Sequence, residues 1–340
     1  MSEAEIWQIE EDEGLITQAY PRRMAKRELK DGIIEVERLS KHYPPDLKAV
    51  DEISFTIKRG QIFSLLGPNG AGKTTAVEIL EGLREPTSGS ARIFGVDISH
   101  DYDKIRKRVG ILPQNFEPFE MLRPLEALEY WAHLFNMKKS NKELLELIES
   151  VGLGGKKDAM GGKMSGGEKR KLGIAMSLIN DPELLFLDEP TTGLDPKARR
   201  DLWALIQGIK KRGATVVLTT HYLDEAEKLS DDVAIMNKGR VIARGTPDQL
   251  IEQYGKETYI VLVGVGQTAV EELAKRGITS HRENGNVVVP VSNPRELRTM
   301  FAKLSSIQVE FKDMYTRRQT LEDVFLNLVG QKMDEGVLRA

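Results

Sequence analysis

The sequence contains no cysteine, which excludes disulfides, thiolate nucleophiles and cysteine-based metal sites. It also lacks long apolar runs: Leu184–Leu187 and Ile260–Val263 are far shorter than the roughly 18 consecutive residues that a membrane-spanning helix needs. The segment Met1–Glu13 is acidic and has neither a basic n-region nor an apolar h-region, so no secretory signal is visible. These absences lead us to expect a cytoplasmic protein.

Positive charge is not in excess, because 49 Lys and Arg residues stand against 52 Asp and Glu residues and give a formal net charge of −3. This balance gives no support to a protein that binds nucleic acid through bulk positive charge, and no nucleic-acid partner is expected. The five histidines show no pairing at the spacing of metal ligands, so structural zinc is not expected.

The 340 residues exceed one average domain of about 100–200 residues and fit two domains, or one domain with a large appendage. With 40% hydrophobic and 30% charged residues, the composition is typical of a soluble globular protein. Residues 1–31 change from acidic to basic around Pro21, which predicts an extension outside the main fold. This extension is either a solvated, partly helical tail or a segment that contacts a partner or an anionic membrane face.

A glycine-rich segment follows the apolar run Ile62–Leu66, which is typical of a buried strand, and precedes the helix-compatible Ala76–Leu83. It matches G-x-x-x-x-G-K-T in the strand-loop-helix context of a phosphate-binding loop, rather than that of a merely structural turn. The loop turns its N–H groups toward phosphate oxygens, while Lys73 reaches the β and γ phosphates and Thr74 holds Mg²⁺. The predicted nucleotide-binding residues are Gly67, Pro68, Asn69, Gly70, Ala71, Gly72, Lys73, Thr74 and Thr75.

Two adjacent carboxylates, Asp188 and Glu189, end a second apolar strand that begins at Leu184. Asp188 is placed to bind Mg²⁺ through water, and Glu189 is placed to polarise the water that attacks the γ-phosphorus. The alternative is that two acids merely terminate a strand. Adjacent acids repel each other unless a cation lies between them or they point apart.

The segment Met164–Glu168 then opens an amphipathic helix, and here the sequence resembles the ATP-binding cassette (ABC) family, whose signature is usually L-S-G-G-Q. The other family motifs follow in order over roughly residues 33–245. They are an aromatic residue before the first core strands (Tyr43), the phosphate loop, a glutamine after a short strand (Gln114), the signature (Ser165, Gly166, Gly167, Glu168), the Asp188-Glu189 pair, Gly193-Leu194-Asp195, and His221 after Thr215–Thr220.

The resemblance implies a set of roles in ATP hydrolysis. Tyr43 would stack on adenine, although a strand-end tyrosine buried for packing is the alternative. Gln114 would accept from metal-bound water while its loop bends toward a neighbouring protein, and it joins Thr74 and Asp188 as a metal-site residue; otherwise it is an ordinary loop amide. His221 would donate to the γ-phosphate or steady Glu189, or else be a satisfied core histidine.

The signature implies two chains, because Ser165, Gly166 and Gly167 form a second anion site that closes over the γ-phosphate held by the opposite subunit. Asp195 is the corresponding dimer-loop residue. Glu168 departs from the family pattern, which has glutamine. Since Ser165-x-x-Glu168 is also a capping box, Glu168 either fixes the helix start or weakens closure near the partner's ATP.

The predicted fold class is α/β, a P-loop NTPase cassette with a mixed sheet core, an antiparallel β part and an inserted helical subdomain, followed by a small C-terminal α+β domain. The cassette is assigned to residues 32–253, with helices at Leu125–Phe135 and Lys142–Val151 in a helical subdomain at about 116–180. The C-terminal domain is assigned to 254–340. Its predicted elements alternate as Tyr259–Val263, Ala269–Arg276, Val287–Val291, Pro294–Leu304, Ile307–Phe311 and Leu321–Val329.

A single cassette without membrane spans resembles the ATPase subunit of a transporter whose pore is another polypeptide. The segment Thr320–Phe325 resembles the tail of exporter ATPases of the daunorubicin-resistance type (ABC-2), with other single-cassette transporters or regulatory ATPases as alternatives. We therefore expect an ATP- and Mg²⁺-dependent ATPase at the cytoplasmic face of the cell membrane. It would form a homodimer or heterodimer of cassettes and drive a separate polytopic permease. The competing class is a cassette ATPase that acts on a soluble assembly or repair complex.

Overall fold

The computed structural model describes residues 32–255, 258–266, 268–292, 294–306, 310–330, 333–334 and 337–338, so the predicted extension at 1–31 lies outside the described residues. The chain divides into two compact units between Ile242 and Ala243. This division precedes the predicted boundary after residue 253, because helix α8 (Pro247–Tyr254) packs on α11 (Leu321–Val329) within the second unit. No helix among the described residues is long and apolar enough to cross a bilayer.

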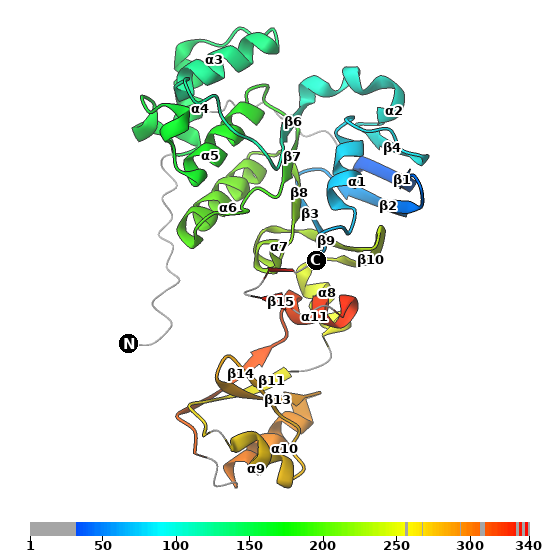
Figure 1. The fold of residues 1–340 in the computed structure, drawn as a ribbon, viewed down its shortest axis with the longest axis vertical. Helices are drawn as coiled ribbons and strands as arrows, with labels where there is room; N and C mark the ends of the chain where they lie inside the picture. The colour runs from blue at the N-terminus through cyan, green and yellow to red at the C-terminus, as the bar shows by residue number, and fades with distance from the viewer. Residues whose placement is uncertain are drawn as a thin grey trace. The chain divides into compact units, whose positions relative to one another are not determined.

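The first unit is built around a six-stranded sheet with the order β10-β9-β3-β8-β7-β6 (Figure 1). The neighbouring pairs β3-β9, β3-β8, β7-β8 and β6-β7 are parallel. β3 and β7 are buried at every residue, which explains their continuous apolar sequences. The strands are β3 (Ile62–Leu66), β6 (Val109–Leu112), β7 (Leu184–Asp188), β8 (Thr215–Thr220), β9 (Asp232–Asn237) and β10 (Arg240–Gly245).

A four-stranded antiparallel sheet, ordered β2-β1-β4-β5, forms the second layer, and α1 (Lys73–Leu80) shares one core with both sheets. Phe55 of the antiparallel sheet stacks on Phe63 of β3, with ring centroids 5.2 Å apart. The predicted mixed sheet with an antiparallel part is therefore confirmed. The strands are β1 (Gly32–Tyr43), β2 (Leu47–Lys58), β4 (Ser88–Ile93) and β5 (Val96–Asp97), and the short helix α2 (Ile98–Asp101) follows.

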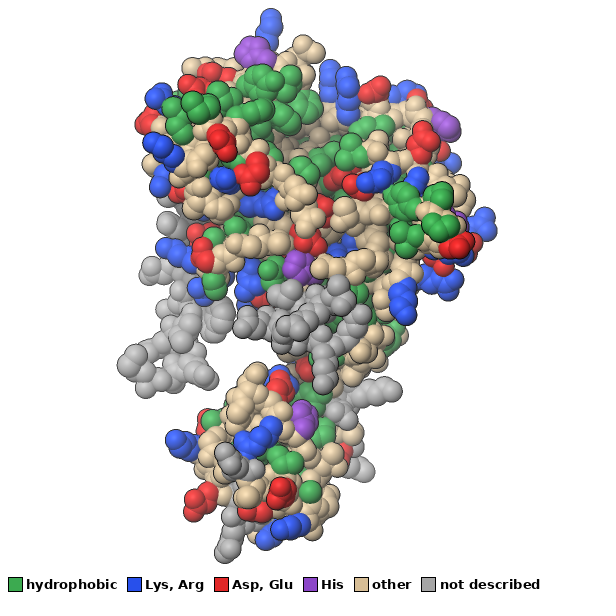
Figure 2. Space-filling model, in the orientation of Figure 1, with side chains coloured by type: hydrophobic (Ala, Val, Ile, Leu, Met, Phe, Trp, Pro, Cys, Tyr) green, Lys and Arg blue, Asp and Glu red, His purple; other side chains and the backbone are tan. Residues whose placement is uncertain are grey.

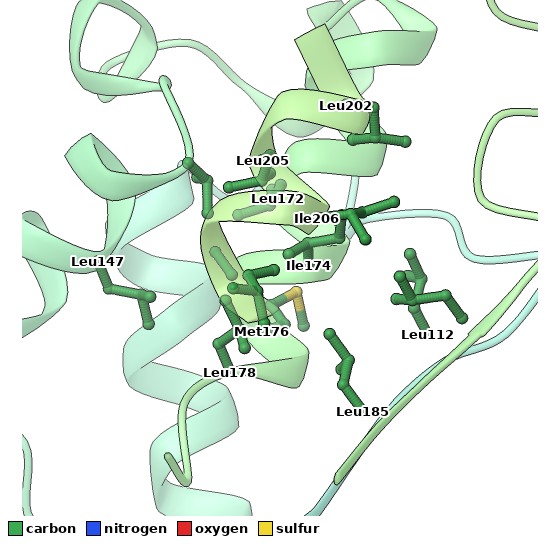
Figure 3. Packing of buried hydrophobic residues seen from close by; sticks show 14 of the residues in the cluster. Leu112, Leu147, Leu172, Ile174, Met176, Leu178, Leu185, Leu202, Leu205 and Ile206 are labelled. Atoms are coloured by element: carbon green, nitrogen blue, oxygen red, sulfur yellow. The ribbon is translucent and has the colours of Figure 1, made fainter. Parts of the chain in front are cut away.

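Helices α3 (Pro124–Leu134), α4 (Asn141–Ser150) and α5 (Gly166–Ser177) make up the inserted helical part, and α3 and α4 agree with the predicted helices to within one residue. Figure 3 shows side chains of α5 such as Leu172 and Met176 gathered with those of the neighbouring α6 (Pro196–Lys211). Leu112 of β6 and Leu185 of β7 belong to the same buried cluster. The start of α5 is thus fixed relative to the central sheet.

The second unit contains an antiparallel sheet with the order β12-β13-β11-β14, and α9 and α10 contribute to the apolar core on it. Most predicted elements here are present, and the strand predicted at Ile307–Phe311 falls mainly on residues that the structure does not describe. Of that range, only Glu310 and Phe311 are described, and they lie in no strand. The structure also has a strand that was not predicted, β14 (Asp313–Arg318), a polar sequence at the sheet edge. The remaining elements are β11 (Thr258–Val263), α9 (Ala269–Lys275), β12 (His281–Glu283), β13 (Asn286–Val291), α10 (Pro294–Ser305), β15 (Met333–Asp334) and β16 (Val337–Leu338).

Candidate active site

The polar residues predicted from the sequence follow four strands of the central sheet. The phosphate loop follows β3, Gln114 follows β6, Glu189 follows β7 and His221 follows β8. Because these four strands are parallel, their carboxyl ends meet at one edge of the sheet. The fold therefore brings together side chains that lie more than 100 positions apart in the sequence.

The phosphate loop is pressed closely against the rest of the fold. Gly72 has a φ of 100° and immediately precedes α1, and a Cβ there would collide with the carbonyl oxygen of Ala49. A Cβ at Gly67 would collide with the carbonyl oxygen of Met236. Gly70, in contrast, faces open space and is exposed. These two close approaches require glycine, while the tip of the loop stays open for a ligand.

Lys73 begins α1 and is only 4% exposed, because its side chain arches back over the loop. Its Nζ donates to the carbonyl oxygens of Gly67 at 2.8 Å and Pro68 at 3.2 Å, and lies 3.9 Å from Glu189 Oε1. Burial lowers the pKa of Lys73, although Glu189 and Asp188 partly oppose that effect. A desolvated ammonium group at the inner side of an N–H-rich loop is suited to an anionic ligand.

Thr219 of β8 forms hydrogen bonds with both residues of the acidic pair. Its hydroxyl donates to Asp188 Oδ1 and accepts from the backbone N–H of Glu189 at 3.0 Å. Glu189 itself has a φ of 46°, which is uncommon outside glycine and turns its side chain out of the strand direction. The adjacent acids are thereby held in different surroundings, and burial raises the pKa of Asp188.

Glu189 is surrounded by groups that favour its charged form. Its Oε2 accepts from Gln114 Nε2 at 3.0 Å and from Thr192 Oγ1 at 3.1 Å, and lies 3.1 Å from His221 Nδ1. Burial alone would raise the pKa of Glu189, but His221 and Lys73 outweigh it and hold the pKa below its ordinary value. The carboxylate is therefore ionised at neutral pH and able to accept a proton.

Tyr43 is the last residue of β1, and Gln114 lies two residues after the end of β6. Tyr43 is half-buried at the end of β1, with the Lys41 ammonium group 5.4 Å and the Arg84 guanidinium group 5.9 Å from its ring centroid. The loop of Gln114 is held by Arg170 of α5, which donates to the Gln114 carbonyl oxygen at 2.6 Å. This link joins α5 to the carboxylate that Gln114 contacts.

Ser165 is the N-cap of α5, and the predicted capping box is confirmed. Its hydroxyl accepts from the Glu168 backbone N–H at 3.3 Å, and Glu168 Oε2 accepts from the Ser165 backbone N–H at 2.8 Å. Glu168 Oε1 also lies 3.1 Å from Lys156 Nζ, and the pKa of Glu168 is lowered by the Ser165 N–H and by Lys156. The charge that distinguishes this signature is therefore paired.

The signature and Asp195 are adjacent to each other, because a Cβ at Gly167 would lie 2.9 Å from Cβ of Ala198 at the start of α6. Asp195 caps that helix and accepts from the backbone N–H groups of Lys197 at 2.9 Å and Ala198 at 3.0 Å. Within the described residues, no hydrogen bond or ion pair joins Ser165 or Glu168 to the Lys73 and Glu189 cluster. The chain thus presents two separate helix N-termini.

The predicted metal-site residues offer only oxygen donors of the kind that Mg²⁺ prefers, namely the Asp188 carboxylate, the Thr74 hydroxyl and the Gln114 amide oxygen. In the described part of the chain, no group of three or more His, Asp or Glu side chains is arranged to hold a metal ion alone. These few donors fit a Mg²⁺ ion that also takes oxygens from a nucleotide. Sequence reasoning missed Thr219, Thr192 and Arg170, which lack a motif of their own.

The family model and the relatives that match this sequence all point to ATP-binding proteins of transporters. The family model described as ABC transporter matches residues 50–192. The chain is 36% identical over 310 residues to the daunorubicin/doxorubicin resistance ATP-binding protein DrrA of Streptomyces peucetius, covering 89% of this chain and 94% of that protein. It is 37% identical to the Nod factor export ATP-binding protein I of Burkholderia lata, covering 85% and 95%.

Solved structures agree on the fold of the first unit. An ATP-binding subunit of an ABC transporter matches with a TM-score of 0.58 and 31% identity, covering 66% of this chain and 93% of that chain. A dimeric ATP-binding cassette in a post-hydrolysis state, bound to ADP and Pi, matches with a TM-score of 0.57 and 26% identity, covering 63% and 98%. The predicted cassette fold is confirmed.

Proposed function

Because this chain belongs to the ABC transporter family and is an ATP-binding, ATP-hydrolysing subunit of it, we propose that it drives export through a separate membrane-spanning permease. The observation that carries the chemistry is the ionised Glu189 held among Gln114, His221 and Lys73. The direction of transport rests on the relatives, which are named for drug resistance and for Nod factor export. The permease would hold this subunit at the cytoplasmic face of the membrane.

In the proposed reaction, Glu189 takes a proton from water as the water oxygen attacks the γ-phosphorus and the bond to the bridging oxygen breaks. Lys73 and the loop N–H groups bind the phosphates, and His221 orients Glu189 or donates to the γ-phosphate. Tyr43 stacks on adenine. Mg²⁺, held by Thr74, Asp188 through water, and Gln114, would neutralise charge on the phosphate oxygens.

We infer that each ATP is completed by a second cassette. The helix start at Ser165 is capped, carries two glycines, and has no bond to the Lys73 cluster of its own chain within the described residues. In a dimer that places this helix start over the γ-phosphate bound to the other chain, the N-terminus of α5 and the N-terminus of the other chain's α1 would bind the same anion. The same arrangement places Asp195 near the interface, because α5 and α6 begin side by side.

An apolar surface around α3 supports a protein partner for the helical part. Phe119, Met121, Tyr130 and Leu134 are 45%, 79%, 48% and 55% exposed, and Figure 2 shows hydrophobic side chains gathered over α3. The occupant we propose is a cytoplasmic segment of the permease. Arg170 of α5, in the same helical part, donates to the Gln114 carbonyl oxygen, so movement of these helices would be transmitted through Gln114 to Glu189.

Purification of the tagged full chain from detergent-solubilised membranes tests the proposal. We expect a multi-spanning membrane protein to co-purify, and Met121→Ser with Tyr130→Ser to reduce its recovery while basal ATPase activity is retained. Leu47→Ser is the matched control, because Leu47 is an apolar residue on the β1-β2 hairpin whose exposure, 62%, lies between those of Tyr130 and Met121. Recovery of only a soluble complex, unaffected by these changes, would favour the assembly or repair alternative.

A further inference from the structure

Glu225 is a buried carboxyl group that none of the roles above uses. It lies in the first turn of α7 (Leu223–Leu229) and is 0% exposed. Taking a carboxyl group out of water is unfavourable unless hydrogen-bond donors replace the water. Both donors found here come from other elements of the fold, which indicates that the group joins those elements.

One oxygen of Glu225 accepts two hydrogen bonds. The Thr191 hydroxyl donates to Glu225 Oε1 at 2.9 Å, and the Trp203 indole N–H donates to the same atom at 3.0 Å. Thr191 lies two positions after Glu189, in the turn that leads to Asp195, and Trp203 lies on α6, which Asp195 caps. Glu225 thus connects α7 both to the turn after the catalytic carboxylate and to α6.

Helix α7 begins two residues after His221, and its N-cap Tyr222 makes no side-chain cap hydrogen bond. The ring of Tyr222 packs 4.4 Å from that of His221. Arg199 of α6 lies over the rings of both Tyr222 and Trp203, at 5.2 Å and 5.4 Å from their centroids, and pairs with Asp224 at 3.4 Å. The place of His221 beside Glu189 therefore depends on how α7 is held against α6.

We propose that Glu225 is a positioning residue that holds His221 beside Glu189 and ties both to the turn from Thr191 to Asp195. This inference rests on the roles proposed above for Glu189 and His221. The carboxyl group acts as an acceptor, so its charge is not required. In agreement, burial raises the pKa of Glu225, against the lowering effects of Thr220, Thr191 and Trp203.

Two substitutions of Glu225 distinguish its role as a hydrogen-bond acceptor from any role of its negative charge. Glu225→Gln keeps a carbonyl oxygen at the position of Oε1, and kcat should stay within about threefold of the unmodified protein. Glu225→Ala removes the acceptor and should lower kcat about tenfold or more, with KM for ATP changed by less than about threefold, because the phosphate loop is not touched. Thr191→Val removes one hydrogen bond without a change of shape and should lower kcat by an intermediate factor.

The measurement is kcat per folded nucleotide-binding site in the full chain, with active sites counted by binding of a fluorescent ATP analogue. Leu273→Ala, a core change in α9 of the second unit, is the control for lost stability and should leave kcat per site unchanged. If Glu225→Ala fails to fold, the proposal is tested by Thr191→Val and Trp203→Phe, each of which removes one hydrogen bond to Glu225. Wild-type kcat per site in Glu225→Ala, or in both of those variants, would overturn the proposal.

His221→Ala and Glu189→Gln are measured in parallel. If these two variants retain turnover, the proposed catalytic roles fail and the inference about Glu225 fails with them. If they lose turnover while Glu225→Ala and Thr191→Val keep it, only the inference about Glu225 is wrong. A loss in Glu225→Gln equal to that in Glu225→Ala would also contradict it, because an acceptor oxygen is then not sufficient.

Discussion

The side-chain amide of Gln114 donates to Glu189 across 3.0 Å, although the two residues follow different strands. The carbonyl oxygen of the same Gln114 accepts from Arg170, which lies five residues after the Ser165 cap of the signature helix. A chain of direct contacts therefore runs from the helical part to the proposed general base. Movement of α5 would change how Glu189 is held, which is the coupling that a transport ATPase requires.

Glu189→Gln should lower steady-state ATP hydrolysis at least about a hundredfold while ATP affinity stays within about threefold, because the carboxylate acts on water rather than on binding. Phosphate release and nucleotide binding measure the two quantities. Glu183→Gln is the matched control, since Glu183 precedes the same strand but pairs with Arg59 and Arg108 at the surface. Turnover of Glu189→Gln within a few-fold of the unmodified protein would exclude Glu189 as the base.

The effect of the Glu168 charge on ATP-dependent dimerisation can be tested by breaking its ion pair with Lys156 in the Glu189→Gln background. Lys156→Ala should weaken ATP-dependent dimerisation by roughly two- to fivefold, the scale of an exposed ion pair, because Glu168 is then left unneutralised near the partner's phosphates. Adding Glu168→Gln should restore it. Light scattering against ATP concentration measures the effect, with the exposed Lys157→Ala as control. Equal dimerisation in all variants would show that this charge does not reach the nucleotide.

Motifs with a short internal spacing were predictable from the sequence. The phosphate loop after Ile62–Leu66 and the Ser165-to-Glu168 capping box depend on neighbouring residues, and both are found as predicted. Contacts between distant segments were not: Thr219 meets Asp188 from another strand, and Arg170 meets Gln114 from another element. Their positions are set by sheet order and helix packing, for which a single sequence carries no local signal.

The absence of β14 from the predicted elements has the same origin. Asp313–Arg318 is a strand because it pairs with β11, although its exposed edge position leaves a polar sequence without a clear apolar pattern. The more apolar Ile307–Phe311 had the stronger local signal. The two compact units divide before the boundary predicted after residue 253, because the packing of α8 on α11 joins segments separated by more than 60 residues.

The buried carboxyl group of Glu81 should make the free energy of unfolding depend on pH. This residue at the end of α1 is 4% exposed, and burial, with Asp188 and Glu78, raises its pKa to about 8. Between pH 4.5 and 8 the folded state keeps a proton that the unfolded state has released. Its contribution to the free energy of unfolding is therefore greatest below pH 4.5 and falls as pH rises to 8, by at most about 1.4 kcal/mol per pH unit.

Glu81→Gln should remove this dependence, because the amide does not titrate. Urea denaturation of both proteins at pH 5, 6, 7 and 8.5 measures it, and the difference between the two proteins isolates Glu81 from the other carboxylates. The variant should gain stability relative to the unmodified protein as pH rises. Parallel stability curves across the whole range would mean that Glu81 is not protonated in the folded state.

The central claim is that each ATP is bound between Lys73 of one chain and Ser165 of another. Lys73→Ala and Ser165→Arg should each be nearly inactive as homodimers. When the two variants are mixed, about half of the dimers are heterodimers, and each has one intact site and one site with both lesions. If the sites act independently, the mixture should regain about a quarter of normal ATPase activity.

Crosslinking first establishes that mixed dimers form, and the activity of the mixture is then compared with that of each variant alone. Recovery of roughly a quarter of normal hydrolysis is the result that our account predicts. Mixed dimers that form yet neither hydrolyse ATP nor protect one nucleotide from exchange would contradict a shared site in a homodimer, and would favour an asymmetric pair with a different cassette subunit.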